Sequence, residues 1–171
     1  MKLSTIIIAL TLPLASANTL ADDYICSPIT GKIQQLQPDP ACAVLLAKPK
    51  HFTDIIFLPS SAAAPTCFAS TLTATIGNRA VSGTVSSGLT LNDQGQLTAA
   101  SAIHFNAGTV ELGDVYTTDI VFDADNPAIT TELLTMVDGR KTFKDGHGHF
   151  KINGNALFSP TTFSGTLCVE N

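Results

Sequence analysis

Hydrophobic and polar residues alternate along most of the chain from Cys67 onward. Within residues 80–91, for example, Val81, Val85 and Leu89 share one parity, and serine and threonine occupy the other. A period of two is typical of β-strands that bury one face and expose the other. The pattern therefore predicts strands rather than helices for this part of the protein.

Seven such runs are separated by short segments rich in glycine, asparagine and aspartate, such as Asn92–Gly95 and Asp138-Gly139. Residues of these types favour tight turns, and short connections favour antiparallel neighbours. The predicted strands span about 67–76, 80–91, 96–105, 109–123, 128–137, 143–153 and 156–169. A meander of this kind forms either a closed barrel or a sandwich.

The segment 22–66 is less regular, but it belongs to the same domain as the strands of 67–171. It contains a candidate eighth strand, a short helix, a second short strand and a proline-bounded connector, at 24–35, 41–47, 54–58 and 59–65 respectively. The fold class that we predict is all-β, with a closed antiparallel barrel of about eight strands.

The first 21 residues have the features of a secretory signal peptide. Lys2 precedes an apolar run at 6–15, and small residues then offer cleavage after Ala17 or after Ala21. The apolar run is too short to span a bilayer, and no later stretch is long enough to do so. We favour cleavage after Ala21 and predict export, to a periplasmic or extracellular location.

Removing the first 21 of the 171 residues leaves 150, which is the size of one ordinary domain. Lys2 is the only charged residue in the removed segment, so the formal net charge changes from −5 to −6. An acidic chain with few lysines and arginines is unsuited to binding nucleic acid, whose phosphates require clustered cations.

All four cysteines lie in the exported part, and an oxidising compartment favours two disulfides among them. A zinc site made of four cysteines would require closely spaced pairs, whereas the spacings here are 16, 25 and 101 residues. Three disulfide pairings are possible. Cys67 and Cys168 lie on the outward, polar parity of the first and last strands of the meander, and barrel closure would place these strands side by side. A bridge between the two cysteines would therefore favour a closed barrel, so we expect Cys67–Cys168, which leaves Cys26–Cys42.

The C-terminal stretch "TTELLTMVDGRKTFKDGHGHFKINGNALFSPTTFSGTLCVE" resembles small secreted bacterial proteins related to the allene oxide cyclase and dirigent barrel family. "SGTVSSGLTL" and "VYTTDIVFD" fit earlier strands of that pattern, and the resemblance covers about residues 67–170. Arg140-Lys141 stand where the family usually has Thr-Gly. The resemblance implies an eight-stranded antiparallel barrel, but it carries no activity to this chain, because one fold hosts many functions.

His147 and His149 form a H-x-H pair on a predicted strand, which could supply two ligands to one metal ion. The pair shares its face with Lys151, whose charge would repel a dication. A third ligand from Asp145, His104 or His51 is not brought near by the sequence. We therefore favour two surface side chains over a metal site.

Acidic residues inside the barrel would be candidates for acid–base chemistry, because burial raises the pKa of a carboxyl group. Glu132 shares parity with Leu134 and Met136, and Asp114 shares parity with Leu112 and Tyr116. An outward or rim position is the simpler interpretation for both. Glu132 with Tyr116 is the candidate catalytic pair if the carboxyl faces inward.

Established catalytic and cofactor motifs are missing: no G-x-S-x-G nucleophile elbow or complete phosphate loop occurs. The sequence favours a non-catalytic exported barrel without a cofactor, which binds a small apolar ligand in its lumen or a protein partner. An isomerase- or cyclase-like enzyme with a polar cluster in the lumen is the alternative. A third hypothesis is a surface interaction through the face that carries His147, His149 and Lys151.

Overall fold

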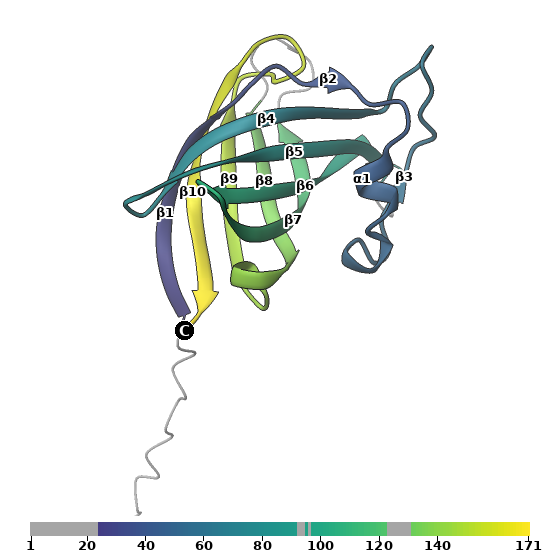
Figure 1. Cartoon of the computed structure of the whole chain (residues 1–171). Coiled ribbons are helices and arrows are strands. Elements are labelled where there is room, and N and C mark those ends of the chain that lie inside the picture. Colours follow the sequence, from purple (N-terminus) through teal and green to yellow (C-terminus); the bar gives the residue numbers. More distant parts are fainter. Residues whose placement is uncertain (1–23, 92–94, 96, 123–130) are drawn as a thin grey trace, which may run out of the picture.

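The computed structural model describes residues 24–91, 95, 97–122 and 131–171 (Figure 1). Within these residues eight antiparallel strands close into a barrel, which confirms the fold class predicted from the alternating pattern. The strands of the wall are β1 (Tyr24–Ile33), β4 (Cys67–Ile76), β5 (Arg79–Leu91), β6 (Leu97–Ala107), β7 (Val110–Phe122), β8 (Thr131–Gly139), β9 (His147–Asn153) and β10 (Thr161–Glu170).

The described part also contains five short elements outside the eight long strands. They are β2 (Gln37–Pro38), α1 (Ala43–Leu46), the 3-10 turn η1 (Pro49–His51), β3 (Ile56–Phe57) and the 3-10 turn η2 (Lys141–Phe143). β2 pairs with β4, and β3 pairs with the end of β5. Both extend the wall only briefly.

The N-terminal strand closes the barrel. Strands β4 to β10 follow one another around the wall in sequence order, and β1 lies between β10 and β4. β1 pairs with β10 from Tyr24 opposite Glu170 to Ile33 opposite Thr161, and its second half pairs with β4. The candidate eighth strand at 24–35 is therefore part of the closed sheet.

This position of β1 overturns the expected disulfide pairing. The disulfides are Cys26–Cys168 and Cys42–Cys67, so the predicted pairs Cys67–Cys168 and Cys26–Cys42 are wrong. Cys26 and Cys168 lie opposite each other on β1 and β10. Because β1 separates β4 from β10, those two strands are about 10 Å apart, beyond the Cα separation of about 7 Å that a disulfide can bridge.

Large apolar side chains fill the middle of the lumen. They come from every strand of the wall and include Ile29, Leu72, Val85, Phe105, Val115, Leu134, Phe150 and Phe163. Phe143 of η2, 2% exposed, packs on the same cluster and closes one end of the barrel. Open space inside the wall is therefore confined to the barrel ends.

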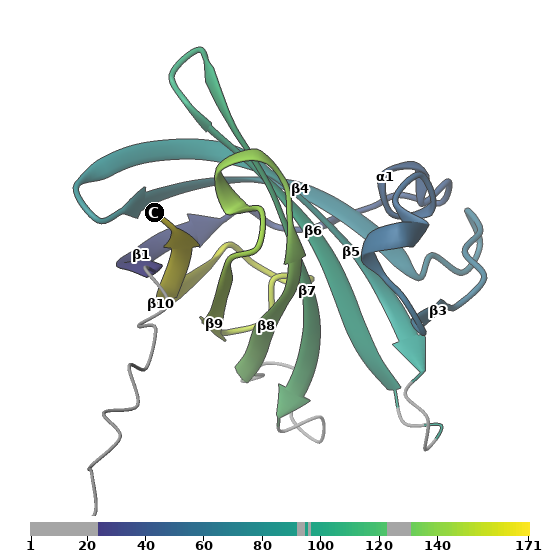
Figure 2. The same ribbon diagram turned by 90° about the horizontal axis from the view of Figure 1, so that it is seen from below.

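Residues 39–66, which we call the strap, cover part of the outer face of the barrel. Figure 2 shows two elements of the strap, α1 and β3, outside the wall beside β5. Leu45 and Phe52 of the strap form a second buried cluster with Ala102 and Tyr116. A Cβ atom on Gly88 would lie 2.8 Å from Leu45, so the strap needs a glycine at that position to pack this closely.

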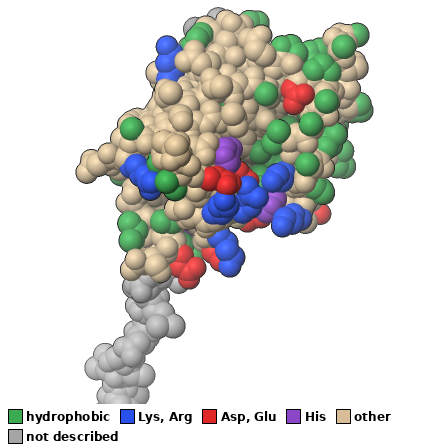
Figure 3. All heavy atoms as spheres, viewed as in Figure 1, with side chains coloured by type: hydrophobic (Ala, Val, Ile, Leu, Met, Phe, Trp, Pro, Cys, Tyr) green, Lys and Arg blue, Asp and Glu red, His purple; other side chains and the backbone are tan. Residues whose placement is uncertain are grey.

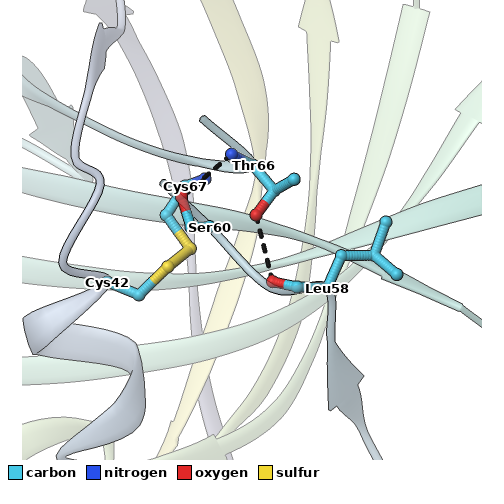
Figure 4. Close-up of a disulfide and its surroundings, with 5 residues drawn as sticks. All are labelled: Cys42, Leu58, Ser60, Thr66 and Cys67. Carbon is cyan, nitrogen blue, oxygen red and sulfur yellow. Dashed lines mark hydrogen bonds between the residues drawn. A yellow bond between two sulfur atoms is a disulfide. The ribbon is translucent and has the colours of Figure 1, made fainter. Parts of the chain in front are cut away.

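Sulfur and hydrogen bonds fix the strap at its two ends. The Cys42–Cys67 disulfide joins the start of α1 to the first residue of β4 (Figure 4). The Thr66 hydroxyl donates a 3.0 Å hydrogen bond to the carbonyl oxygen of Leu58, and the Thr66 amide donates to the Ser60 hydroxyl. The two Thr66 bonds lie within the strap, and the amide of Cys67 in the wall donates a 3.4 Å hydrogen bond to the Ser60 hydroxyl, which holds this end of the strap against β4.

The predicted signal peptide, residues 1–21, lies outside the described residues. In the part of the chain that the structure describes, no helix has the length and hydrophobicity needed to cross a bilayer.

Candidate functional site

A pocket of about 180 Å³ opens into the lumen at the end opposite Phe143, and we call it the lumen pocket. Its walls are mainly apolar and include Leu36, Phe68, Leu89, Ala99 and Leu157. Two carboxyl groups, those of Asp119 and Glu132, also line it. A small apolar pocket with a few converging polar groups is the usual form of a ligand site.

Asp119 of β7 is 3% exposed and faces the lumen. Its Oδ2 accepts a 2.7 Å hydrogen bond from the Ser101 hydroxyl, and its Oδ1 accepts a 2.8 Å bond from the Thr117 hydroxyl. Burial raises the pKa of Asp119 to about 6, although the two hydroxyl donors lower it in part. Two neutral donors orient the carboxylate but do not neutralise its charge.

Glu132 of β8 is half-buried and shares the lumen-facing parity of Leu134 and Met136, which both belong to the core. It lies opposite Val121 on β7, two residues along the strand from Asp119. Burial, and then the negative charge of Asp119, raise the pKa of Glu132 to about 7. The structure thus places Glu132 on the inward face at one end of the lumen, so the expectation that its side chain points outward is wrong.

The pKa values of the two carboxyl groups lie close to neutral pH, so one group can carry a proton while the other is ionised. At pH 7 a proton is readily held by one group and available to a bound molecule, as in acid–base sites built from paired carboxyls. Because no cation contributes to the pKa of either group, the pair forms an acidic, partly protonated end to an apolar pocket.

Tyr116, the residue predicted to act with Glu132, does not meet it. Tyr116 is fully buried, but it points to the outer face of the wall, where it packs with Phe52 of the strap. The His51 ring stacks on it with a centroid distance of 4.0 Å. The wall of the barrel therefore separates Tyr116 from the lumen pocket, and Asp119 is the residue that the structure brings to Glu132.

Asp114 also lies on the outer face, as the simpler interpretation of the sequence expected, yet it is only 6% exposed. It accepts hydrogen bonds from Nδ1 of His104 at 2.7 Å and from the Tyr116 hydroxyl at 2.9 Å. Nε of Arg140 lies 2.9 Å from its Oδ2. Burial alone would raise the pKa of Asp114, but these donors and charges outweigh it and lower the pKa below its ordinary value.

Asp114 in turn affects the pKa of the neighbouring Tyr116. Burial, followed by the hydrogen bond to Asp114, raises the pKa of Tyr116, so the phenol remains protonated. His51, which stacks on Tyr116, has its Nδ1 2.5 Å from Oδ2 of Asp138. A polar network therefore runs beneath the strap from Asp138 to His104.

The histidine pair lies elsewhere, on the outer face of β9. His147 and His149 are both exposed and stand opposite Cys168 and Thr166 of β10. In the described part, the one cluster of potential metal ligands is His147 with Cys26 and Cys168, whose sulfur atoms are already joined in a disulfide. His51 and His104, considered as third ligands, are hydrogen-bonded to aspartates beneath the strap.

Comparisons with known proteins find no match to this chain among protein-family models, curated proteins or solved structures. The resemblance to the allene oxide cyclase and dirigent barrel family therefore stays a prediction.

Proposed function

We propose that this protein binds a small, largely apolar molecule in the lumen pocket, with the polar end of that molecule against Glu132 and Asp119. The observation that carries the proposal is the combination of apolar walls with a buried carboxyl group, that of Asp119, and a half-buried one, that of Glu132. Apolar walls favour a hydrophobic body, and burying it provides most of the affinity. The carboxyl pair selects the polar group of the ligand.

The charge of the pair narrows the class of ligand. An anionic ligand would be repelled by Asp119 and Glu132, because none of the described residues that line the lumen pocket is a cation. A hydroxyl group can donate to an ionised carboxylate and accept from a protonated one, and an ammonium group would neutralise the pair. We therefore expect a neutral alcohol or an amine with an apolar body.

Native mass spectrometry of the protein purified from its own host tests the proposal. Ala99 lies opposite Asp119 on β6 and lines the lumen pocket, so Ala99→Leu fills the space that the ligand would occupy. We expect a co-purifying small molecule in the wild type that is lost in Ala99→Leu. The matched control is Ala80→Leu, at an exposed position of β5, which should keep the ligand.

Either of two results would reject ligand carriage in the lumen. One is a wild-type protein that never carries an additional mass. The other is an Ala99→Leu variant that carries the same mass as the wild type.

A second candidate function is acid–base catalysis of an isomerisation or cyclisation in the same pocket. It is supported by the pKa values of Asp119 and Glu132, about 6 and about 7, which lie near the pH at which a group can both give and take a proton. This function requires the wild type to convert the bound molecule into an isomer of equal mass, visible by NMR. Glu132→Gln should bind the molecule but leave it unchanged. Conversion by that variant at the wild-type rate would exclude acid–base catalysis by Glu132, and a wild type that leaves the molecule unchanged would exclude the enzyme.

Export is also part of the proposed function. Both disulfides connect segments that are distant in sequence, and such bonds persist in oxidising compartments. Cleavage after Ala21 would place Asp22 at the N-terminus of the protein isolated from the host. N-terminal sequencing that instead begins at Met1 would contradict export by this signal.

A further inference from the structure

A second pocket, of about 240 Å³, lies between the strap and the outer face of the barrel, and we call it the strap pocket. The strap contributes Val44 and Lys48, and the barrel contributes Ala102, His104, Asp114 and Arg140. Its position outside the wall separates it from the lumen pocket. Figure 3 shows lysine and arginine side chains gathered around histidine and acidic side chains on this side of the molecule.

Positive groups outnumber negative ones in the strap pocket. Lys48 and Arg140 share a single buried carboxylate, that of Asp114, so these three side chains together carry one unit of surplus positive charge. Glu111 adds little to the balance, because it is exposed at the rim and pairs with Lys141 as well as with Arg140. A surplus of positive charge in a partly enclosed cavity attracts anions.

Hydrogen-bond donors are also in surplus. Nε of Arg140 is buried and has no hydrogen-bond acceptor among the described residues, because its N–H does not point along the 2.9 Å line to Asp114. Nζ of Lys48 is 3.8 Å from Asp114, too far for a hydrogen bond. His104 uses Nδ1 for Asp114, and no described residue bonds its Nε2. A buried donor without an acceptor is costly unless a ligand or water supplies one.

From this arrangement we propose that the strap pocket is a second binding site, which takes a small carboxylate with a short apolar tail. The guanidinium of Arg140 and the ammonium of Lys48 bind the carboxylate, since planar guanidinium groups match its two oxygens. Val44 and Ala102 supply the apolar surface for the tail. This site prefers the anions that the lumen pocket repels.

The ligand would also link the strap to the barrel. Lys48 follows α1 in the strap, whereas Arg140 follows β8 in the barrel wall. A carboxylate held by both side chains therefore bridges the two parts of the molecule.

Titration of the full-length, disulfide-bonded protein with sodium butyrate, followed by amide NMR spectra, tests this inference. We expect a Kd on the order of 1 mM for a ligand of this size, with shifts in the amides of Ala102, His104 and Asp114 and none in those of Ala99 and Asp119. Arg140→Gln should weaken binding at least tenfold. Lys48→Gln, a surface change that preserves the buried network, should weaken it severalfold.

Matched controls separate the site from general charge effects. Lys151→Gln, at an exposed position of β9, removes the same unit of charge and should leave the butyrate Kd within twofold of the wild type. Butylamine, which has the same tail but a positive end, should produce no shifts at the strap pocket. Inorganic phosphate should bind more weakly than butyrate, because it lacks the tail.

Three results would overturn the inference. The first is butyrate binding of equal strength in the wild type, Arg140→Gln and Lys48→Gln. The second is phosphate binding at the strap pocket without butyrate binding. The third is butyrate-induced shifts confined to the lumen pocket, a result that would count against the proposed function as well.

Discussion

Strand β7 carries two buried aspartates, Asp114 and Asp119, whose surroundings are opposite in character. They are five positions apart in the sequence, and because successive side chains of a strand alternate between its faces, they lie on different sides of the wall. Asp114 faces the strap and is bonded or paired to His104, Tyr116 and Arg140. Asp119 faces the lumen and is bonded to two neutral hydroxyls.

The comparison shows that burial alone does not decide the state of a carboxyl group. Both aspartates are less than 10% exposed, yet the pKa of Asp114 is lowered and that of Asp119 is raised to about 6. Charged donors overcome the loss of hydration around Asp114, whereas hydroxyl groups do not do so around Asp119. Asp114 therefore contributes to stability, whereas the burial of Asp119 and Glu132 disfavours their ionised forms.

The largest expected effect comes from making the same substitution at both sites. Asp114→Asn removes the carboxylate that pairs with Arg140 and accepts from His104, and we expect a loss of about 2 kcal/mol in the free energy of unfolding at pH 8, after allowing for the partial exposure of the cations. Asp119→Asn removes an ionised buried carboxylate, so it should be neutral or stabilising by about 1 kcal/mol. Urea unfolding followed by far-UV circular dichroism measures both.

Glu111→Gln serves as the control for that pair of variants, because Glu111 is exposed at the rim. It should change the free energy of unfolding by less than about 0.5 kcal/mol. Equal losses in Asp114→Asn and Asp119→Asn would show that the two environments do not differ as described.

A smaller effect is expected in the pH dependence of stability. The pKa of Glu132 is about 7 in the folded chain and has an ordinary value of 4.5, so the folded state binds the extra proton between these pH values. The stability that Glu132 contributes is therefore fully present below pH 4.5 and is lost as the pH rises to about 7. Glu132→Gln should gain on the order of 2 kcal/mol relative to the wild type between pH 4.5 and pH 8.

The lowered pKa of Asp114 has the opposite consequence. Its contribution is present above its ordinary pKa of 3.8 and is lost as the pH falls through the lower folded value. Unfolding curves at several pH values separate the two windows. As a control, Glu170→Gln at an exposed position of β10 should leave the pH profile unchanged, and a flat difference between Glu132→Gln and the wild type would exclude a raised pKa at Glu132.

The sequence was sufficient for the strands, because alternation records which face of each strand is buried. Alternation alone left both a barrel and a sandwich open, and the sequence favoured the closed barrel through the polar parity of Cys67 and Cys168 and the family resemblance. The sequence was insufficient for the order of strands where the barrel closes, because hydrophobic and polar residues alternate less clearly in β1. The insertion of β1 between β10 and β4 also depends on pairing between distant parts of the chain. The two disulfide pairings were wrong for that reason alone. The outward parity predicted for Cys67 and Cys168 agrees with their pairing to a strap residue and to β1.

The candidate site was harder to predict because the alternation of inward and outward side chains is interrupted within β7. The pairing of β6 and β7 shifts beyond Phe105, where Gly113 has a φ of 127°, so both Leu112 and Val115 face the lumen. Counting parity from Leu112 therefore placed Tyr116 inside and left Asp119 unnoticed. The strap also buries part of the outer face, which makes Tyr116 resemble a core residue in the sequence pattern.

NMR titration of the side-chain carboxyl carbons tests the central contrast most directly, because it reports each carboxyl group in the intact protein. We expect two coupled transitions for the carboxyl groups of the lumen pocket, near pH 6 for Asp119 and near pH 7 for Glu132. For Asp114 we expect a transition below its ordinary pKa of 3.8. Transitions of Asp119 and Glu132 at or below about pH 4.5 would contradict this contrast, because ordinary carboxylates of that kind would be hydrated and would give the lumen pocket no special chemistry.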